Sequence, residues 1–153
     1  MIGRLKDSIG KRGAFDSLEQ EVFLTLLHTA DALGRPFDEL FRGAGLSPTQ
    51  YNVLRILRGA GRDGLACSQI GGRMITRDPD MTRMLDRLQK RRLITRKRQS
   101  DDRRVVKAFV TSQGLTLLVK LDEPVRRLHV DQFAHVNRQR LQMLLDLLHE
   151  VRS

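Results

Sequence analysis

The chain has 153 residues, 40% of them hydrophobic, which suits one domain with helical extensions and excludes a chain that is disordered as a whole. Its formal net charge is +10 at pH 7, which favours an anionic partner, most often nucleic acid. The sequence has no run of 18 apolar residues, and its N-terminal segment is polar. We therefore expect no membrane helix, no signal peptide and a cytoplasmic location.

Residues that often build metal or catalytic sites are sparse. Cys67 is the only cysteine, and the four histidines stand at no ligand-like spacing, so we expect no metal and no cofactor. No Gly-rich phosphate loop and no Ser/His/Asp arrangement stands out. An enzyme is therefore the least favoured class of protein.

Most of the positive charge lies in one block. Residues 73–107 contain 13 Lys and Arg against five Asp, a net charge of +8, whereas the other 118 residues carry a net charge of +2. A surface that is merely well solvated would spread its charge more evenly. The block favours a nucleic-acid-binding face, with a solvated basic face that has no partner as the alternative.

The first half of the chain contains two long helical patterns. Apolar residues recur three or four positions apart over residues 15–43, and Pro36 either kinks this helix or opens a second one. Ser47 and Gln50 then provide the Ser-x-x-Gln pattern of a capping box. A further helix is therefore predicted over residues 47–59.

The clearest helical pattern covers residues 79–91, after a shorter helix predicted at about residues 67–74. We expect Asp78 to cap the longer helix and Pro79 to occupy its first position. Its apolar face contains Met81, Met84, Leu85 and Leu88. The opposite face contains Arg83, Arg87 and Lys90. One face is thus suited to a core and the other to phosphates and base edges.

The next segment predicts a β-hairpin. The runs LITRKR and RVVKAFVT are β-prone and flank the turn residues 99–102. Helical periodicity returns from about residue 112, and a last helix is predicted over residues 138–151 with Asn137 as its cap.

These elements predict a mostly α-helical fold with a small β-hairpin wing (α+β), namely a winged helix-turn-helix with N- and C-terminal dimerisation helices. We assign residues 46–114 to a winged helix-turn-helix DNA-binding domain, and residues 1–45 and 115–153 to a helical dimerisation region. The flanking helices are too apolar to stand alone, so we expect them to bury each other in a homodimer. The alternative is that they pack back on their own domain.

Three segments, LSPTQYNVLRIL, MTRMLDRLQKRRLITR and DDRRVVKAFVTSQG, resemble the MarR family of transcriptional regulators. The likeness covers about residues 15–150. Its most specific part is Asp102-x-Arg104 with Thr111 and Gly114 behind it.

The resemblance implies a homodimer with intertwined terminal helices, a recognition helix at residues 79–91 in the major groove, and a wing at residues 96–104 whose arginine reaches the minor groove. Members of the family usually repress transcription, and many respond to small, often aromatic or phenolic, ligands or to oxidants. For Cys67 the alternatives are an oxidant sensor and, as the commoner case, a lone buried thiol.

One position departs from the family pattern. Arg92 follows the recognition helix where the family usually has Gly. Gly favours the left-handed cap, so Arg92 either carries strain of about 1 kcal/mol or ends the helix differently.

The candidate DNA contacts fall into two groups. Those on the recognition helix and its approach are Ser68, Gln69, Arg73, Arg77, Thr82, Arg83 and Arg87. Those in the wing are Lys97, Arg98, Arg103 and Arg104. Arginine is the usual reader of guanine edges, and side chains near the N-terminus of a recognition helix reach the bases. We expect Lys90 and Arg91 to touch phosphates or solvent.

Asp101 and Asp102 interrupt the basic wing, although carboxylates add nothing to polyanion binding. A free arginine loses up to about 2 kcal/mol of rotamer entropy when it is held in a groove. Asp102 can hold Arg104 by a bidentate pair before DNA arrives, whereas Asp101 is expected to be a turn residue. The alternative is that both are turn formers and that Arg104 is simply solvated.

We therefore predict a sequence-specific DNA-binding transcriptional regulator, specifically a homodimeric repressor of a pseudo-palindromic operator that a small aromatic ligand releases. The alternative is an architectural or RNA-binding winged-helix protein with little sequence preference. A protein-interaction winged helix is disfavoured, because such a helix would expose apolar anchors where this chain has arginines.

Overall fold

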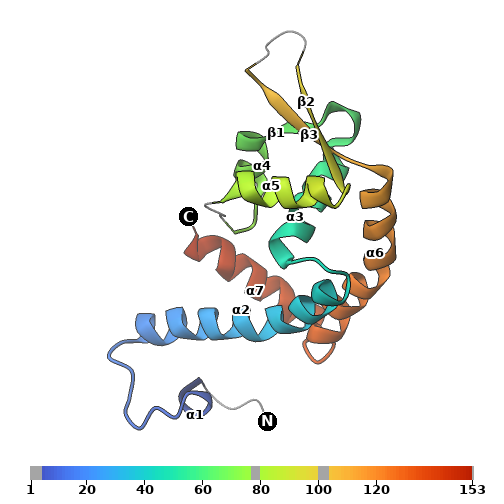
Figure 1. The fold of residues 1–153 in the computed structure, drawn as a ribbon. Helices are drawn as coiled ribbons and strands as arrows, with labels where there is room; N and C mark the ends of the chain where they lie inside the picture. Colours follow the sequence, from blue (N-terminus) through green and yellow to red (C-terminus); the bar gives the residue numbers. More distant parts are fainter. Residues whose placement is uncertain (1–4, 77–79, 100–103, 153) are drawn as a thin grey trace.

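The structure is a computed structural model that describes residues 5–76, 80–99 and 104–152. In these ranges the chain is mostly helical with one small antiparallel sheet (Figure 1), as the sequence predicted. The helices and strands are, in chain order, α1 (Leu5–Ser8), α2 (Leu18–Gly43), α3 (Pro48–Ala60), the 3₁₀ helix η1 (Gly61–Asp63), β1 (Leu65–Ala66), α4 (Cys67–Arg73), α5 (Met81–Lys90), β2 (Ile94–Arg98), β3 (Val106–Val110), α6 (Ser112–Phe133) and α7 (Arg138–Val151). None of the described helices is both long and apolar enough to cross a membrane.

Helix α2 begins after Ser17 rather than at residue 15, because the Ser17 hydroxyl accepts a backbone N–H of the first turn and caps the helix. The helix runs through Pro36, so no second helix opens there. Helix α6 packs against α2, and the side-chain amide of Gln132 donates to the Leu33 carbonyl at 2.6 Å. This contact ties α6 to the turn that precedes the proline.

Helix α3 starts as the capping-box pattern predicted. The Ser47 hydroxyl accepts the Gln50 N–H at 3.1 Å, and the Gln50 side-chain oxygen accepts the Ser47 N–H at 3.0 Å. The apolar face of α3 is fully buried at Val53, Leu54 and Leu57. This helix is therefore the centre of the core.

Three short elements, α1, η1 and β1, have no counterpart in the sequence predictions. Strand β1 pairs antiparallel with β3, with Leu65 opposite Ala108. A strand of two residues has no alternation to recognise, which is why the pattern did not indicate it.

The predicted hairpin is confirmed. Strands β2 and β3 pair antiparallel from Ile94 opposite Val110 to Arg98 opposite Val106, and the sheet order is β1-β3-β2. Beyond the last pair, the Gln99 N–H donates to the Val105 carbonyl at 3.0 Å. The hairpin extends away from the helices (Figure 1).

Helix α5 begins at Met81 with Asp80 at its N-cap, two residues later than predicted. Asp78 and Pro79, which were expected to start it, lie outside the described residues. Leu85 and Leu88 are fully buried, which confirms the predicted apolar face.

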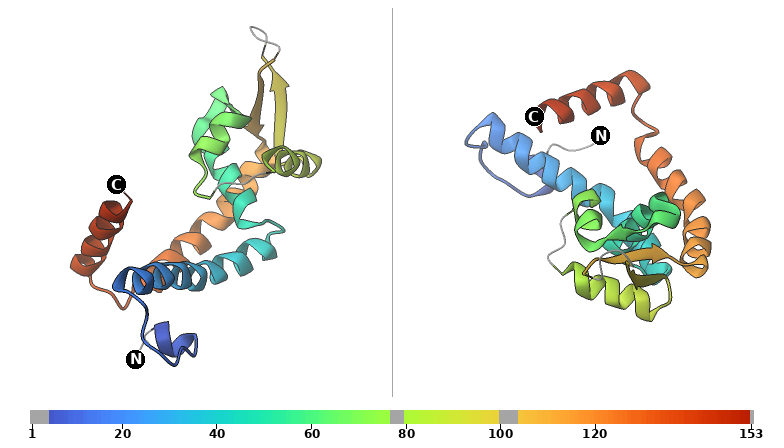
Figure 2. Two further views of the ribbon diagram at one scale, coloured as in Figure 1. Left: turned by 90° about the vertical axis from the view of Figure 1, so that its left-hand side faces the viewer. Right: turned by 90° about the horizontal axis from the view of Figure 1, so that it is seen from above.

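The core lies in the winged helix-turn-helix and at its junction with the first half of α6. Its largest fully buried side chains are Val53, Leu54, Leu57, Ile70, Leu85, Leu88, Ile94 and Leu118. Helix α7, by contrast, has no buried residue. Figure 2 shows that α7 stands apart from the winged helix-turn-helix, beyond the turn that ends α6.

Candidate nucleic-acid interface

The solvent-facing side of α5 is basic. Arg83 and Arg87 are exposed on the side of the helix opposite the buried Leu85 and Leu88, as predicted, and Lys90 is exposed beside them. The Arg83 guanidinium lies 3.3 Å from the carboxylate of the N-cap Asp80. Thr82, at the start of the helix, is also exposed. These exposed side chains are accessible to a phosphate backbone or a base edge.

Helix α4, which precedes α5 in the chain, contains three of the predicted DNA contacts. Ser68, Gln69 and Arg73 are exposed on this helix. The side-chain oxygen of Gln69 accepts the Ala66 N–H at 2.9 Å, so this residue also fixes the start of α4. Arg77, the fourth predicted contact of this segment, lies outside the described residues.

The wing has exposed cations on both described sides of its tip. Lys97 and Arg98 are exposed at the end of β2, and Arg104 is exposed before β3. Asp102 and Arg103 lie outside the described residues, so the Asp102–Arg104 pair stays a prediction.

A contact between the hairpin and α5 was not predicted. Arg96 in β2 forms an ion pair with Asp86 in α5 and donates to the side-chain oxygen of Gln89 at 2.6 Å. The sequence signal that could have found it is the carboxylate of Asp86, which lies on the flank of α5 between its buried face and its basic face.

Just beyond α5, the chain adopts at position 92 the left-handed backbone conformation that explains why the family usually has Gly there. Arg92 has a φ of 58° and is the only non-glycine with a positive φ among the described residues. The Thr111 hydroxyl donates to the Arg92 carbonyl at 2.6 Å and accepts the Gly114 N–H at 3.1 Å. A Cβ on Gly114 would lie 2.8 Å from Val110 Cγ2 and closer still to the Leu93 carbonyl. The end of α5, β3 and α6 therefore meet at a tightly packed junction.

Arg91 was expected to touch phosphates or solvent. Its side chain is exposed to solvent, and its guanidinium also donates to the Gly45 carbonyl, in the loop between α2 and α3. Arg91 thus ties the end of α5 to the rest of the domain.

A pocket of about 440 Å³ lies between α2, α3, α6 and the residues that follow α4. Its apolar and aromatic lining consists of Phe37, Phe41, Pro48, Tyr51, Ile56, Ile75 and Val125. Its polar lining consists of Thr49, Asn52, Arg55, Thr76 and His129. The rings of Phe37 and His129 lie 4.6 Å apart, and those of Phe41 and Tyr51 stack at 4.1 Å.

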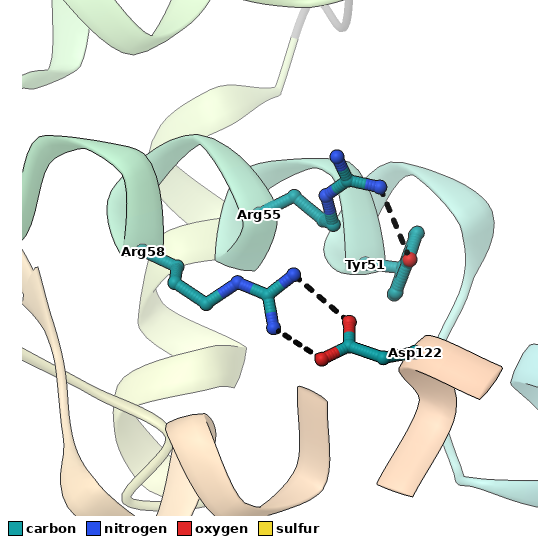
Figure 3. Close-up of polar contacts among 4 residues, drawn as sticks. All are labelled: Tyr51, Arg55, Arg58 and Asp122. Atoms are coloured by element: carbon teal, nitrogen blue, oxygen red, sulfur yellow. Dashed lines mark hydrogen bonds and ion pairs between the residues drawn. The ribbon is translucent and has the colours of Figure 1, made fainter. Parts of the chain in front are cut away.

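Figure 3 shows polar contacts of Tyr51 and Arg55, which line this pocket, and of Arg58 and Asp122. Arg55 reaches the Tyr51 hydroxyl at 3.5 Å, and Arg58 makes two hydrogen bonds of 2.9 Å to Asp122 in α6. These bonds lower the pKa of the Asp122 carboxyl and raise the pKa of Arg58. Helices α3 and α6 are thereby joined next to the pocket.

The pocket also touches the segment that leads to α5. The Asn52 side-chain oxygen accepts the Ile75 N–H at 3.2 Å and holds this segment at the pocket rim. Ile75 is 88% exposed, an unusual position for a large apolar side chain. Cys67, at the start of α4, is half-buried, and it is not among the pocket-lining residues.

Comparisons with known proteins identify the family. The MarR family model matches residues 46–106, which cover most of the winged helix-turn-helix. The crystal structure of a MarR transcription factor from Planctomyces limnophilus is 42% identical, covers 89% of this chain and 98% of its own, and has a TM-score of 0.68.

Two more distant structures share the fold. The S. aureus MepR–DNA complex is 16% identical over 84% of this chain and 93% of its own, with a TM-score of 0.76. NadR in complex with 4-hydroxyphenylacetate is 24% identical over 91% of this chain and 97% of its own, with a TM-score of 0.70. The identity to the Planctomyces limnophilus protein over nearly its whole length confirms the resemblance carried by the sequence motifs, and the chain belongs to the MarR family of transcriptional regulators.

Proposed function

We propose that the protein is a homodimeric repressor that binds a pseudo-palindromic DNA operator and is released from it by a small aromatic ligand. The observation that carries the DNA-binding part is the basic face of α5, with Arg83, Arg87 and Lys90 exposed opposite a fully buried apolar face. A helix that is buried on one side and cationic on the other is suited to insertion into a major groove.

The other predicted contacts fit the same mode of binding. With α5 in the major groove, the hairpin projects beside it and can reach the adjacent minor groove with the cations at its tip (Figure 1). Ser68, Gln69 and Arg73 on α4 are exposed and available to the phosphate backbone. The proposed interface also includes residues of the same segments, namely Arg77 and Arg103 as DNA contacts and Asp102 as the residue that orients the wing.

The exposed apolar side chains of the terminal helices support a homodimer. Those of α2 are Leu18, Val22, Phe23 and Leu27, and those of α7 are Met143, Leu144, Leu145, Leu147, Leu148 and Val151. Leu18 is 72% and Val151 is 67% exposed, although such patches are rarely left in water. A second copy of the chain, pairing residues 1–45 and 115–153 of both protomers, would cover them. Two-fold symmetry then predicts half-sites about 10 bp apart.

The pocket supports the ligand part of the proposal. Its volume of about 440 Å³ and aromatic lining suit a small aromatic molecule, and Arg55 and His129 offer partners for a carboxylate or hydroxyl group. NadR, with the same fold, binds 4-hydroxyphenylacetate. The pocket includes Ile75 and Thr76, so a bound ligand would press on the segment that positions α5.

The test of DNA binding uses the full chain. Duplexes selected from a random library and scrambled controls are compared by fluorescence anisotropy across a salt series. We expect specific binding about a thousandfold tighter than control binding, and a salt slope that reports the number of phosphate contacts. Equal binding to all duplexes, or to RNA duplexes, would favour the architectural or RNA-binding alternative.

Two single substitutions test whether α5 is the surface that contacts DNA. Arg83→Ala should weaken specific binding by roughly 1–3 kcal/mol and relax the preference at one base pair. Arg126→Ala is the matched control, because it removes the same charge from the α6 surface, where Arg126 pairs with Glu123. Equal losses for both variants would refute the assignment of α5 as the reading helix.

The ligand part is tested with aromatic carboxylates such as 4-hydroxyphenylacetate. We expect them to release the parent protein from its selected duplex. Arg55→Gln should require higher concentrations of carboxylates but not of uncharged phenols, whereas Arg62→Gln, outside the pocket, should behave as the parent does. Release that is unaffected by Arg55→Gln would remove this residue from the site.

A further inference from the structure

Asp86 is a carboxylate in the middle of α5, a helix whose exposed charged side chains are otherwise Arg83, Arg87 and Lys90. At about 100° per residue, Thr82, Asp86 and Gln89 share the flank of α5 between its buried face and its basic face. Phosphates approaching the basic face would meet the negative charge of Asp86 at close range. A helix that only had to attract DNA would carry a neutral or basic residue there.

The partner of Asp86 comes from the wing. Arg96 lies in the middle of β2, opposite Ala108 of β3, and shares a face of the sheet with the buried Ile94. From that face its guanidinium forms the ion pair with Asp86 and donates to Gln89 at 2.6 Å. The Arg96 side chain is only 24% exposed and that of Asp86 is 48% exposed, so the pair is partly shielded from water.

We propose that Asp86 is a positioning residue that clamps Arg96, and through it the wing, at one angle to the recognition helix. The inference rests on the DNA-binding function proposed above. The base of the hairpin is fixed by the buried Ile94 and Ala108 and by the pairing of β3 with β1. Without a further tether, the outer part of the hairpin could swing, and each swing would separate the two groove contacts by a different distance. With Arg96 held by two partners on α5, the wing and the helix meet adjacent grooves in one register.

The clamp also resolves the electrostatic conflict. In the pair, the Asp86 charge is satisfied by Arg96 and repels phosphates less than a free carboxylate would. If Asp86 were only an unfavourable charge, its removal would tighten binding to every duplex. If it positions the wing, its removal weakens binding to the selected duplex and leaves binding to a scrambled duplex equal or tighter. The two explanations therefore predict opposite changes in affinity for the selected duplex when Asp86 is replaced.

The experiment measures both affinities for the full-length parent and for Asp86→Asn by anisotropy, with the duplexes described above. We expect Asp86→Asn to bind the selected duplex about tenfold more weakly, with no loss on the scrambled duplex. Replacing the flanking A·T pairs by G·C should weaken the parent but not Asp86→Asn, because the variant has lost its fixed minor-groove contact. Asp86→Glu, which keeps the charge, should restore most of the specific affinity.

Three further variants distinguish the clamp from a simple folding defect. Gln89→Ala removes a second partner of Arg96 from an exposed position without any change of charge, and it should show a smaller loss confined to the selected duplex. Asp63→Asn, in the η1 helix of the same domain, removes an equal charge away from α5 and should not lower specific binding. The double variant Asp86→Asn/Arg96→Gln should be no weaker than Arg96→Gln alone.

The outcomes separate this inference from the function on which it rests. Equal or tighter binding of Asp86→Asn to the selected duplex, with the parent binding specifically, would overturn the clamp and leave the DNA-binding proposal intact. Failure of the parent to prefer any duplex would overturn the proposed function and the clamp with it.

Discussion

Arg92 should be a position where glycine makes the protein more stable. Its φ of 58° places it in the left-handed region, and its side chain is exposed. An L-residue with a Cβ pays roughly 1–2 kcal/mol for this conformation. Glycine avoids that cost but loses about 0.5–1 kcal/mol more conformational entropy on folding than other residues. The difference predicts that Arg92→Gly stabilises the fold by about 0.5–1 kcal/mol.

Substitution of the neighbouring Arg91 by glycine provides a control, for which we expect the opposite change in stability. Arg91 has a φ of −83°, where glycine offers no relief, and its guanidinium donates to the Gly45 carbonyl. Arg91→Gly therefore loses a hydrogen bond and gains unfolded-state entropy, and it should destabilise the fold by about 1–2 kcal/mol. Both variants lose one positive charge, so charge effects largely cancel in the comparison.

The assay is urea unfolding at one fixed protein concentration, because unfolding of the proposed dimer would depend on concentration. Thermal unfolding should show Arg92→Gly about 1–4 °C above the parent, since 1 kcal/mol corresponds to about 2–4 °C in a chain of this size. Destabilisation of Arg92→Gly to the same degree as Arg91→Gly would refute the strain argument.

Three other substitutions test the packing around Gly114, with Gly59 as its control, and the ion pair between Arg58 and Asp122. Gly114→Ala should destabilise by about 1–3 kcal/mol because its Cβ would collide with the Leu93 carbonyl, whereas Gly59→Ala, which meets nothing within 4 Å, should stabilise by up to about 1 kcal/mol; thermal denaturation of both decides. Asp122→Asn should lower the unfolding free energy at pH 7 by at most about 1 kcal/mol, because the pair with Arg58 is partly exposed. The pKa of Asp122 is lowered in the fold, so this contribution is present above the ordinary carboxyl pKa of about 4 and is lost as pH falls through the lowered value. A difference between parent and variant that persists at pH 2 would contradict this cause.

The helices of this fold could be predicted because their signals are local. Periodicity and caps placed α3 and α7 to within one residue, and Ser47 and Asn137 cap them as expected. The start of α5 was misplaced by two residues, because Asp78 and Asp80 are both acceptable caps and the pattern favoured the one followed by proline.

The contacts that join elements could not be predicted in the same way. Asp86 and Arg96 are ten residues apart and meet only because the chain reverses after α5, so neither periodicity nor spacing indicates the pair. The pocket brings Phe37 and His129 together from α2 and α6, which are distant in sequence. The wing contacts of Asp102 remain predictions, since this residue lies outside the described part of the chain.

The proposed clamp between Asp86 and Arg96 predicts how the two groove contacts respond to a ligand. A ligand in the pocket would act at Ile75, whose backbone is held to α3 by Asn52, and would displace the segment that enters α5. Because Asp86 and Arg96 tie the wing to α5, we expect both groove contacts to weaken at the same ligand concentration rather than one after the other. Major-groove methylation protection and minor-groove hydroxyl-radical protection, followed across a ligand titration, would show a common midpoint. In Asp86→Asn the two midpoints should separate, and separate midpoints in the parent protein would show that helix and wing move independently.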